Sequence, residues 1–166
     1  MKIFLIGMPG SGKTTLGKQL ATHLQVEFVD LDTEIERAEG KPISDIFLYQ
    51  GEDHFRIVEA KILREWATHQ RSFVMATGGG APCFHHGISV INEYGISVFL
   101  DCPVEELAER VKRNRERPLL LATDEKELRE RLERMRQARL SCYLQAKIVL
   151  PQPSLSTVLK SLDIRK

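Results

Sequence analysis

The segment from Gly7 to Thr14 reads GMPGSGKT and satisfies the pattern G-x-x-x-x-G-K-[ST]. It follows a short apolar run, KIFLI, and precedes a helical pattern with a leucine at every fourth position. In this strand–loop–helix setting, glycines let successive backbone N–H groups point at phosphate oxygens, and the start of the helix adds positive potential. The segment therefore predicts a phosphate-binding loop for ATP or GTP, although it does not determine the reaction.

The residues of this loop have separate predicted roles. The ammonium group of Lys13 would reach the β- and γ-phosphates, and the hydroxyl of Thr14 would ligate Mg²⁺. The residues predicted to bind the nucleotide in this segment are Gly10, Ser11, Gly12, Lys13, Thr14 and Thr15.

Short apolar runs alternate with longer helical patterns along the whole chain. The runs read KIFLI, EFVD, SFVMA, ISVFL and KIVL, and a stretch with helical periodicity follows each of them. This alternation predicts an α/β fold with a five-stranded parallel sheet and helices on both faces. Because a chain of 166 residues is long enough for one core, we expect a single domain over 1–166.

Two helices can be described in more detail from their apolar spacing. The first is expected to begin directly after Gly12, with Leu16, Leu20 and Leu24 as its buried stripe. The second is expected over about 52–68. Its predicted buried residues are Phe55, Ile57, Val58, Ile62, Leu63 and Trp66.

One segment departs from the alternation. Residues 112–117 read KRNRER, and Pro118 follows them. A basic stretch that ends in proline is a poor helix interior, because proline lacks the backbone N–H and clashes with the preceding turn. We therefore expect a mobile lid over about 112–123.

The composition excludes several classes of partner. The 24 basic and 23 acidic residues leave a net charge of +1, so no strong field favours binding to nucleic acid. No apolar run approaches the roughly twenty residues of a membrane span. Cys83, Cys102 and Cys142 are odd in number and lack CxxC spacing, so we expect half-buried thiols without disulfides. We expect a soluble, cytoplasmic protein.

Two carboxylates follow the second apolar run as Asp30-Leu31-Asp32. Alternation along a strand would put both at its carboxyl end, the edge where open α/β sheets bind ligands. One could hold the water shell of Mg²⁺, and the other could bind acceptor hydroxyls or orient the attacking one. Because no aspartate ends the third run, Asp30 is the better candidate for Mg²⁺. The alternative is that Asp32 only caps the following helix.

Three further patterns have both a functional and a structural interpretation. Arg56 and Glu59 share a helix face, which fits a ligand site or a simple ion pair. Three glycines at 78–80 fit the close approach of a ligand or a flexible turn. Arg139, near the end of the last long helix, carries little signal by itself.

Taken together, these segments resemble shikimate kinases, a family of P-loop enzymes related to nucleoside monophosphate kinases. The resemblance runs from Ile3 to about Leu159. It is carried in order by GMPGSGKT at 7–14, DLD at 30–32, GKPISDIF at 40–47, GEDHFRIVE at 51–59, GGGA at 78–81, RPLL at 117–120 and RLSCY at 139–143. The P-loop alone is generic, whereas FRxxE, the triple glycine and RPLL in this order are specific to the family.

The resemblance implies a P-loop kinase that uses ATP and Mg²⁺ to phosphorylate the 3-hydroxyl of shikimate, and a monomer is expected. The residues at shikimate-binding positions of the family are Asp32, Arg56, Gly78, Gly79, Gly80 and Arg139. The residues at catalytic positions are Lys13, Asp32 and Arg117, the last of which lies in the lid. Asp30 and Thr14 fall at the Mg²⁺ position, and Arg110 and Pro153 fall on either side of the adenine.

Two rival interpretations share part of this pattern. Another small-metabolite kinase, such as a gluconate kinase, would also have the P-loop and a lid, but it should not need both Arg56 and Arg139. A regulatory or assembly module that binds ATP without a small acceptor would lack the DLD and GGG segments at the strand ends.

Overall fold

The protein is described by a computed structural model that covers residues 1–113 and 124–163. The strands in this part of the chain are β1 (Lys2–Ile6), β2 (Glu27–Asp30), β3 (Phe73–Ala76), β4 (Ile96–Leu100) and β5 (Ile148–Leu150). The helices are α1 (Lys13–Leu24), α2 (Leu31–Glu39), α3 (Ile43–Thr68), α4 (Gly87–Tyr94), α5 (Val104–Arg113), α6 (Glu125–Tyr143) and α7 (Leu155–Ser161).

The five strands form one parallel sheet in the order β2-β3-β1-β4-β5. The strand β1 lies at its centre, where Leu5 is in register with Ala76 of β3 and Val98 of β4. The five-stranded parallel sheet predicted from the apolar runs is therefore confirmed. Because all strands are parallel, their carboxyl ends meet at one edge, directly before the P-loop and the DLD and GGG segments.

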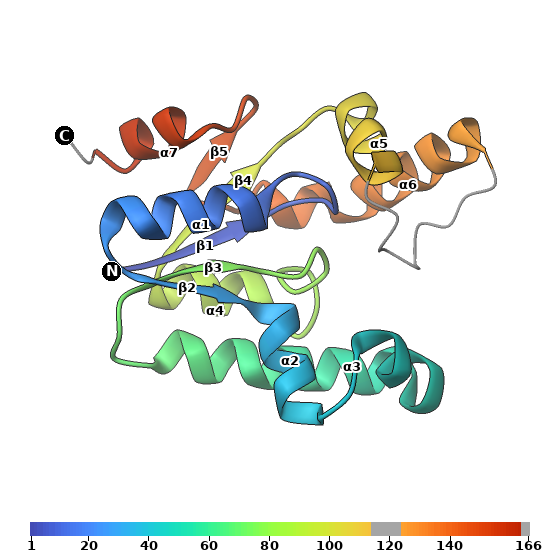
Figure 1. Ribbon diagram of the computed structural model, residues 1–166, viewed down its shortest axis with the longest axis horizontal. Helices are drawn as coiled ribbons and strands as arrows, with labels where there is room; N and C mark the ends of the chain where they lie inside the picture. The colour runs from blue at the N-terminus through green and yellow to red at the C-terminus, as the bar shows by residue number, and fades with distance from the viewer. Residues whose placement is uncertain (114–123, 164–166) are drawn as a thin grey trace.

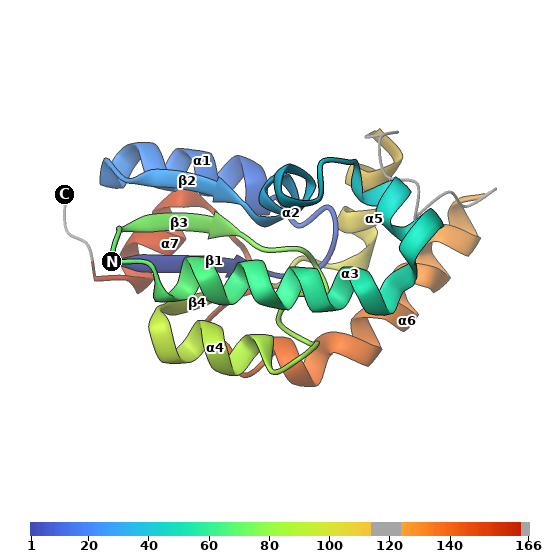
Figure 2. The same cartoon turned by 90° about the horizontal axis from the view of Figure 1, so that it is seen from below.

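Helices cover both faces of this sheet (Figures 1 and 2). Side chains of β1 alternate between the faces: Ile3 and Leu5 belong to a buried cluster with α1 and α7, and Phe4 and Ile6 belong to a second cluster with α3 and α4. Strands that are buried on both faces are apolar at every position rather than at every second one. This is why the run KIFLI is continuous in the sequence.

The helix predicted over about 52–68 is part of a longer element. The helix α3 begins at Ile43, and Gly51 interrupts it with φ 84° and ψ 170°, so the element is two helices joined at a kink. The glycine adopts a left-handed φ that other residues rarely take. The predicted boundary therefore matches the second of the two helices and misses the first.

The predicted buried stripe of this helix is right except at one position. Phe55, Val58, Ile62 and Leu63 are buried, and Trp66 is half-buried. Ile57 is 59% exposed, because two residues along a helix turn the side chain about 200° away from Phe55. The inclusion of Ile57 in the core was wrong.

The cysteines are thiols, as expected. Cys83 and Cys142 are half-buried, whereas Cys102 is fully buried against the P-loop backbone, which differs from the expectation. None of the described helices combines the length and the apolar character that crossing a membrane requires. Most of the predicted lid, together with Arg117, lies outside the described residues.

Candidate active site

A cavity of about 380 Å³ lies at the carboxyl edge of the sheet. Four segments that are distant in the sequence line it: the P-loop with the start of α1, the β2–α2 junction, the end of β3, and α5. The lining residues are Gly10, Gly12, Lys13, Thr14, Thr15, Asp30, Asp32, Ala76, Thr77, Gly78, Gly79, Arg110 and Val111. The sheet thus brings most of the predicted P-loop residues, together with Arg110 and Asp32, to one cavity.

The P-loop has the backbone shape that its glycines predict. Gly10 and Gly12 have φ angles of 81° and 90°, and α1 begins immediately afterwards at Lys13. The side chain of Lys13 is buried in the loop, where its ammonium group donates to the carbonyls of Gly7 at 2.9 Å and Met8 at 2.8 Å. The loop therefore concentrates backbone N–H groups, a helix N-terminus and one buried cation beside the cavity.

The two aspartates of the DLD segment are not both strand residues, as the alternation argument assumed. The strand β2 ends at Asp30, which caps α2 by accepting from the backbone N–H of Asp32 at 3.1 Å. Asp32 lies in the first turn of that helix. Asp30, and not Asp32, is therefore the helix cap, and both still line the cavity because the strand ends there.

A hydroxyl and a carboxylate lie next to each other at this junction. The hydroxyl of Thr14 donates to Oδ2 of Asp30 at 3.2 Å. This places the two residues predicted for Mg²⁺ side by side, on the β1 and β2 sides of the cavity. An oxygen pair of this kind suits a cation that keeps most of its waters, as Mg²⁺ does.

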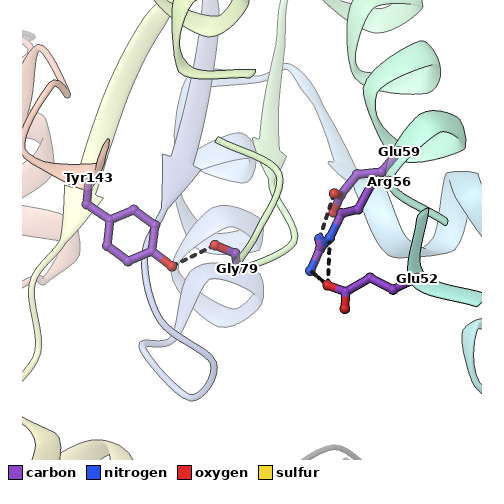
Figure 3. A network of polar contacts seen from close by, with 5 residues as sticks. All are labelled: Glu52, Arg56, Glu59, Gly79 and Tyr143. Carbon is purple, nitrogen blue, oxygen red and sulfur yellow. Dashed lines mark hydrogen bonds and ion pairs between the residues drawn. The ribbon is translucent and has the colours of Figure 1, made fainter. Parts of the chain in front are cut away.

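Arg56 of α3 is buried and held by two carboxylates (Figure 3). Its Nη1 donates to Glu59 Oε2 at 2.7 Å, and its Nε and Nη2 donate to Glu52 Oε1 at 3.3 Å. The pair with Glu59 is nearly inaccessible, with 9% and 2% of the two side chains exposed. The ion pair of the structural interpretation is therefore present, it lies against Gly80, and the ligand site stays a prediction.

Glu59 has an oxygen without a partner. Its Oε1 is buried and makes no hydrogen bond to any residue that the structure describes. Burial raises the pKa of Glu59 above the ordinary glutamate value, against the opposing effect of Arg56. An unpartnered buried acceptor is costly, so it indicates a place where a ligand hydroxyl could donate.

The three glycines at 78–80 make room for four charged side chains. A Cβ at Gly78 would lie 2.8 Å from Glu59 Oε1 and 3.1 Å from Asp32 Oδ1. A Cβ at Gly79 would lie 3.0 Å from Arg139 Nη1, and one at Gly80 would overlap the guanidinium group of Arg56. The glycines therefore leave room for these side chains to converge, and the close approach of a ligand stays a prediction.

The glycine segment is anchored to α6. The hydroxyl of Tyr143 donates to the carbonyl of Gly79 at 2.6 Å (Figure 3). Tyr143 is fully buried, and burial raises the pKa of its phenol well above the ordinary value. Arg139, one helical turn earlier on α6, lies against the same segment at Gly79.

The residues predicted for the adenine are only partly brought to the site. Arg110 lies over the P-loop, where its Nη1 donates to the carbonyl of Gly10 at 3.3 Å and its Nη2 pairs with Glu106 at 2.8 Å. Pro153 lies between β5 and α7 and is not among the residues that line the cavity.

Two side chains of the site were not among the predicted site residues. Glu59 was noted only as a neighbour of Arg56, and Tyr143 only as part of a motif. A charged residue on the apolar face of a helix was the available signal for Glu59. No comparable signal exists for Tyr143, because its partner is a backbone carbonyl 64 residues away.

A P-loop that opens onto the carboxyl edge of this parallel sheet places the chain in the class of P-loop nucleotide-binding proteins. The family model for shikimate kinase matches residues 9–161. The shikimate kinases of Persephonella marina (strain DSM 14350 / EX-H1) and Novosphingobium aromaticivorans (strain ATCC 700278 / DSM 12444 / CCUG 56034 / CIP 105152 / NBRC 16084 / F199) are 41% and 40% identical to this chain. The two matches cover 88% and 97% of this chain, and 85% and 86% of those proteins.

Solved structures give the same result. The crystal structure of shikimate kinase from Bacteroides thetaiotaomicron is similar at a TM-score of 0.92 with 32% identity, over 99% of both chains. Shikimate kinase from Acinetobacter baumannii in complex with shikimate is similar at 0.88 with 34% identity, over 98% of this chain and 91% of that one. The chain therefore belongs to the shikimate kinase family, which confirms the resemblance seen in its sequence.

Proposed function

We propose that this chain transfers the γ-phosphoryl group of ATP to the 3-hydroxyl of shikimate, giving shikimate 3-phosphate and ADP in chorismate and aromatic amino-acid biosynthesis. The observation that carries the proposal is the convergence of Asp32, Arg56, Glu59 and Arg139 on the glycines at 78–80. Two cations and two acceptors around one glycine segment match an acceptor that has one carboxylate and several hydroxyls.

The arginines are proposed to bind the carboxylate of shikimate. A guanidinium group can donate two parallel hydrogen bonds to a carboxylate, and Arg56 and Arg139 lie against neighbouring glycines. Asp32 and the unpartnered oxygen of Glu59 would accept from the ring hydroxyls. Since Asp32 also lines the cavity next to the P-loop, it would orient the attacking hydroxyl toward the γ-phosphate.

On the nucleotide side, Gly10, Ser11, Gly12, Thr14 and Thr15 would bind the phosphates. Lys13 would stabilise the charge that develops on the β–γ bridge. Arg110 and Pro153 are proposed for the adenine. Arg117, in the predicted lid, is proposed to close over the phosphates.

The fold also implies a divalent cation. The described residues include no group of three or more His, Cys, Asp or Glu that could hold a metal ion by themselves. Thr14 and Asp30 nevertheless fit Mg²⁺, which they would hold through their oxygens together with waters and phosphates. When bound, Mg²⁺ neutralises charge on the phosphate oxygens during transfer. We further propose a cytoplasmic monomer without nucleic-acid or membrane partners.

The function is tested by measuring ADP release with ATP and Mg²⁺ in the presence of shikimate, gluconate or no acceptor. We expect release to depend on shikimate, with phosphate appearing on its 3-hydroxyl. Equal ADP release with and without shikimate would contradict the proposal and support a regulatory or assembly module that binds ATP without a small acceptor. ADP release that depends on gluconate instead of shikimate would support a gluconate kinase.

A further inference from the structure

The guanidinium group of Arg56 is closely surrounded by carboxylates and aromatic rings. Its hydrogen bonds to Glu52 and Glu59 use three of its five N–H groups. Within the described part of the chain, this leaves one N–H on each terminal nitrogen for a ligand. The carboxylates fix the edges of the guanidinium plane, but they do not by themselves prevent the plane from tilting.

The face of the same guanidinium is covered by an aromatic ring. The centre of the Phe84 ring lies 4.2 Å from Cζ of Arg56, closer than the ring of Phe55 at 5.1 Å. A ring at this distance attracts the cation and limits rotation out of the stacked geometry. Gly80 lies against the same group and leaves no room for a side chain.

Phe84 has no evident role in the core. It is 38% exposed and belongs to neither of the two buried clusters. Its backbone is nevertheless well held, because the N–H of Gly87 donates to the carbonyl of Phe84 at 2.9 Å and the N–H of Cys83 donates to that of Gly80 at 2.8 Å. A half-exposed phenylalanine on a held turn is therefore directed at Arg56.

We propose that Phe84 is a positioning residue for recognition of the acceptor carboxylate, because it holds the plane of Arg56 with its two remaining N–H groups toward the pocket. This inference rests on the proposed function, in which Arg56 binds that carboxylate. The ring also shields one face of the guanidinium from water, which strengthens the hydrogen bonds to an anion. Phe84 thereby favours a carboxylated acceptor over an uncharged one.

The test is the kinetics of Phe84→Leu, Phe84→Tyr and Phe84→Trp. We expect Phe84→Leu to raise the KM for shikimate about three- to ten-fold, as loss of a partly shielded cation–π contact would, with kcat and the KM for ATP unchanged. The two aromatic variants should restore the KM. Tyr94→Leu is the matched control, since Tyr94 is 40% exposed, lies over Lys2 and is at the opposite edge of the sheet.

Two kinetic results would overturn the proposal: a wild-type KM for shikimate in Phe84→Leu, or an equal change in the kinetics of both substrates. Arg139→Ala separates this failure from failure of the proposed function, because it must raise the KM for shikimate whether or not Phe84 matters. A readout without any substrate is the NMR signal of the Arg56 Nε–H group, identified by its loss in Arg56→Lys. It should shift on Phe84→Leu and not on Tyr94→Leu, and an unchanged signal would also contradict the stacking role.

Discussion

At the scale of single residues, the contacts of each side chain indicate which step of the proposed reaction it would serve. Lys13 is the clearest case, because its ammonium group is buried and already directed into the P-loop by the carbonyls of Gly7 and Met8. A cation held in this way is preorganised, so it needs little rearrangement when charge develops on a phosphoryl group.

We expect Lys13→Ala to lower kcat by about a hundred-fold or more, the effect of removing one preorganised electrostatic contact. Lys18→Ala, an exposed lysine on the same helix, should leave kcat unchanged. Turnover with shikimate and ATP measures both. Wild-type turnover in a folded Lys13→Ala protein would contradict the role of Lys13.

The two arginines need different substitutions. Truncation of Arg56 would leave Glu59 as a buried charge without its partner, which destabilises a fold by about 3–5 kcal/mol. Arg139 is only half-buried, so its truncation tests binding more directly.

We expect Arg139→Ala to raise the KM for shikimate about ten- to a hundred-fold, which corresponds to the loss of a charge-assisted hydrogen bond of roughly 1.5–3 kcal/mol. Arg56→Lys should have an effect in the same direction, because lysine keeps the charge and loses the two parallel donors. The KM for ATP should change little in both variants. Unaltered shikimate kinetics in both would remove the carboxylate assignment.

At the scale of elements, the acceptor pocket depends on how the segment after β3 is attached to α6. A partly buried hydrogen bond from Tyr143 to Gly79 connects them. The same helix carries Arg139, so the position of this arginine relative to the glycines depends on that contact.

We expect Tyr143→Phe to reduce the free energy of unfolding by about 1–3 kcal/mol, because the carbonyl of Gly79 loses its donor. It should also raise the KM for shikimate more than the KM for ATP, since the P-loop is not part of this contact. Tyr94→Phe is the control for loss of a phenolic hydroxyl from an exposed position. Urea denaturation and steady-state kinetics would measure both effects, and equal changes in the two KM values would argue against a local effect.

At the scale of the whole molecule, the buried acid in α3 couples stability to pH. Burial raises the pKa of Glu59 in the folded protein above its ordinary value of about 4.3 in an unfolded chain. The folded state therefore binds a proton more tightly than the unfolded state. This contribution to stability is fully present below the ordinary pKa and is lost as the pH rises through the raised pKa.

We expect the free energy of unfolding of the wild type, minus that of Glu59→Gln, to decrease as the pH rises from about 4.3. Glutamine cannot titrate, so groups that do not interact with Glu59 cancel in this difference. Urea denaturation of both proteins at several pH values would measure it. A difference that grows with pH would mean that Arg56 outweighs burial and that the pKa of Glu59 is lowered.

The local sequence determined the sheet, the P-loop and the class of nucleotide, because strand burial, helix periodicity and glycine spacing act between residues close together in the chain. Through the family resemblance, the sequence also predicts which residues bind the acceptor. The roles of these residues and the single domain over 1–166 stay predictions. Only the tertiary structure decided that Asp30 is the cap of α2, that α3 is kinked at Gly51, and that Ile57 is exposed. Local reasoning also could not show that four side chains meet at the three glycines, namely Arg56, Arg139, Glu59 and Tyr143. Their meeting depends on how α3 and α6 pack beside the segment that follows β3.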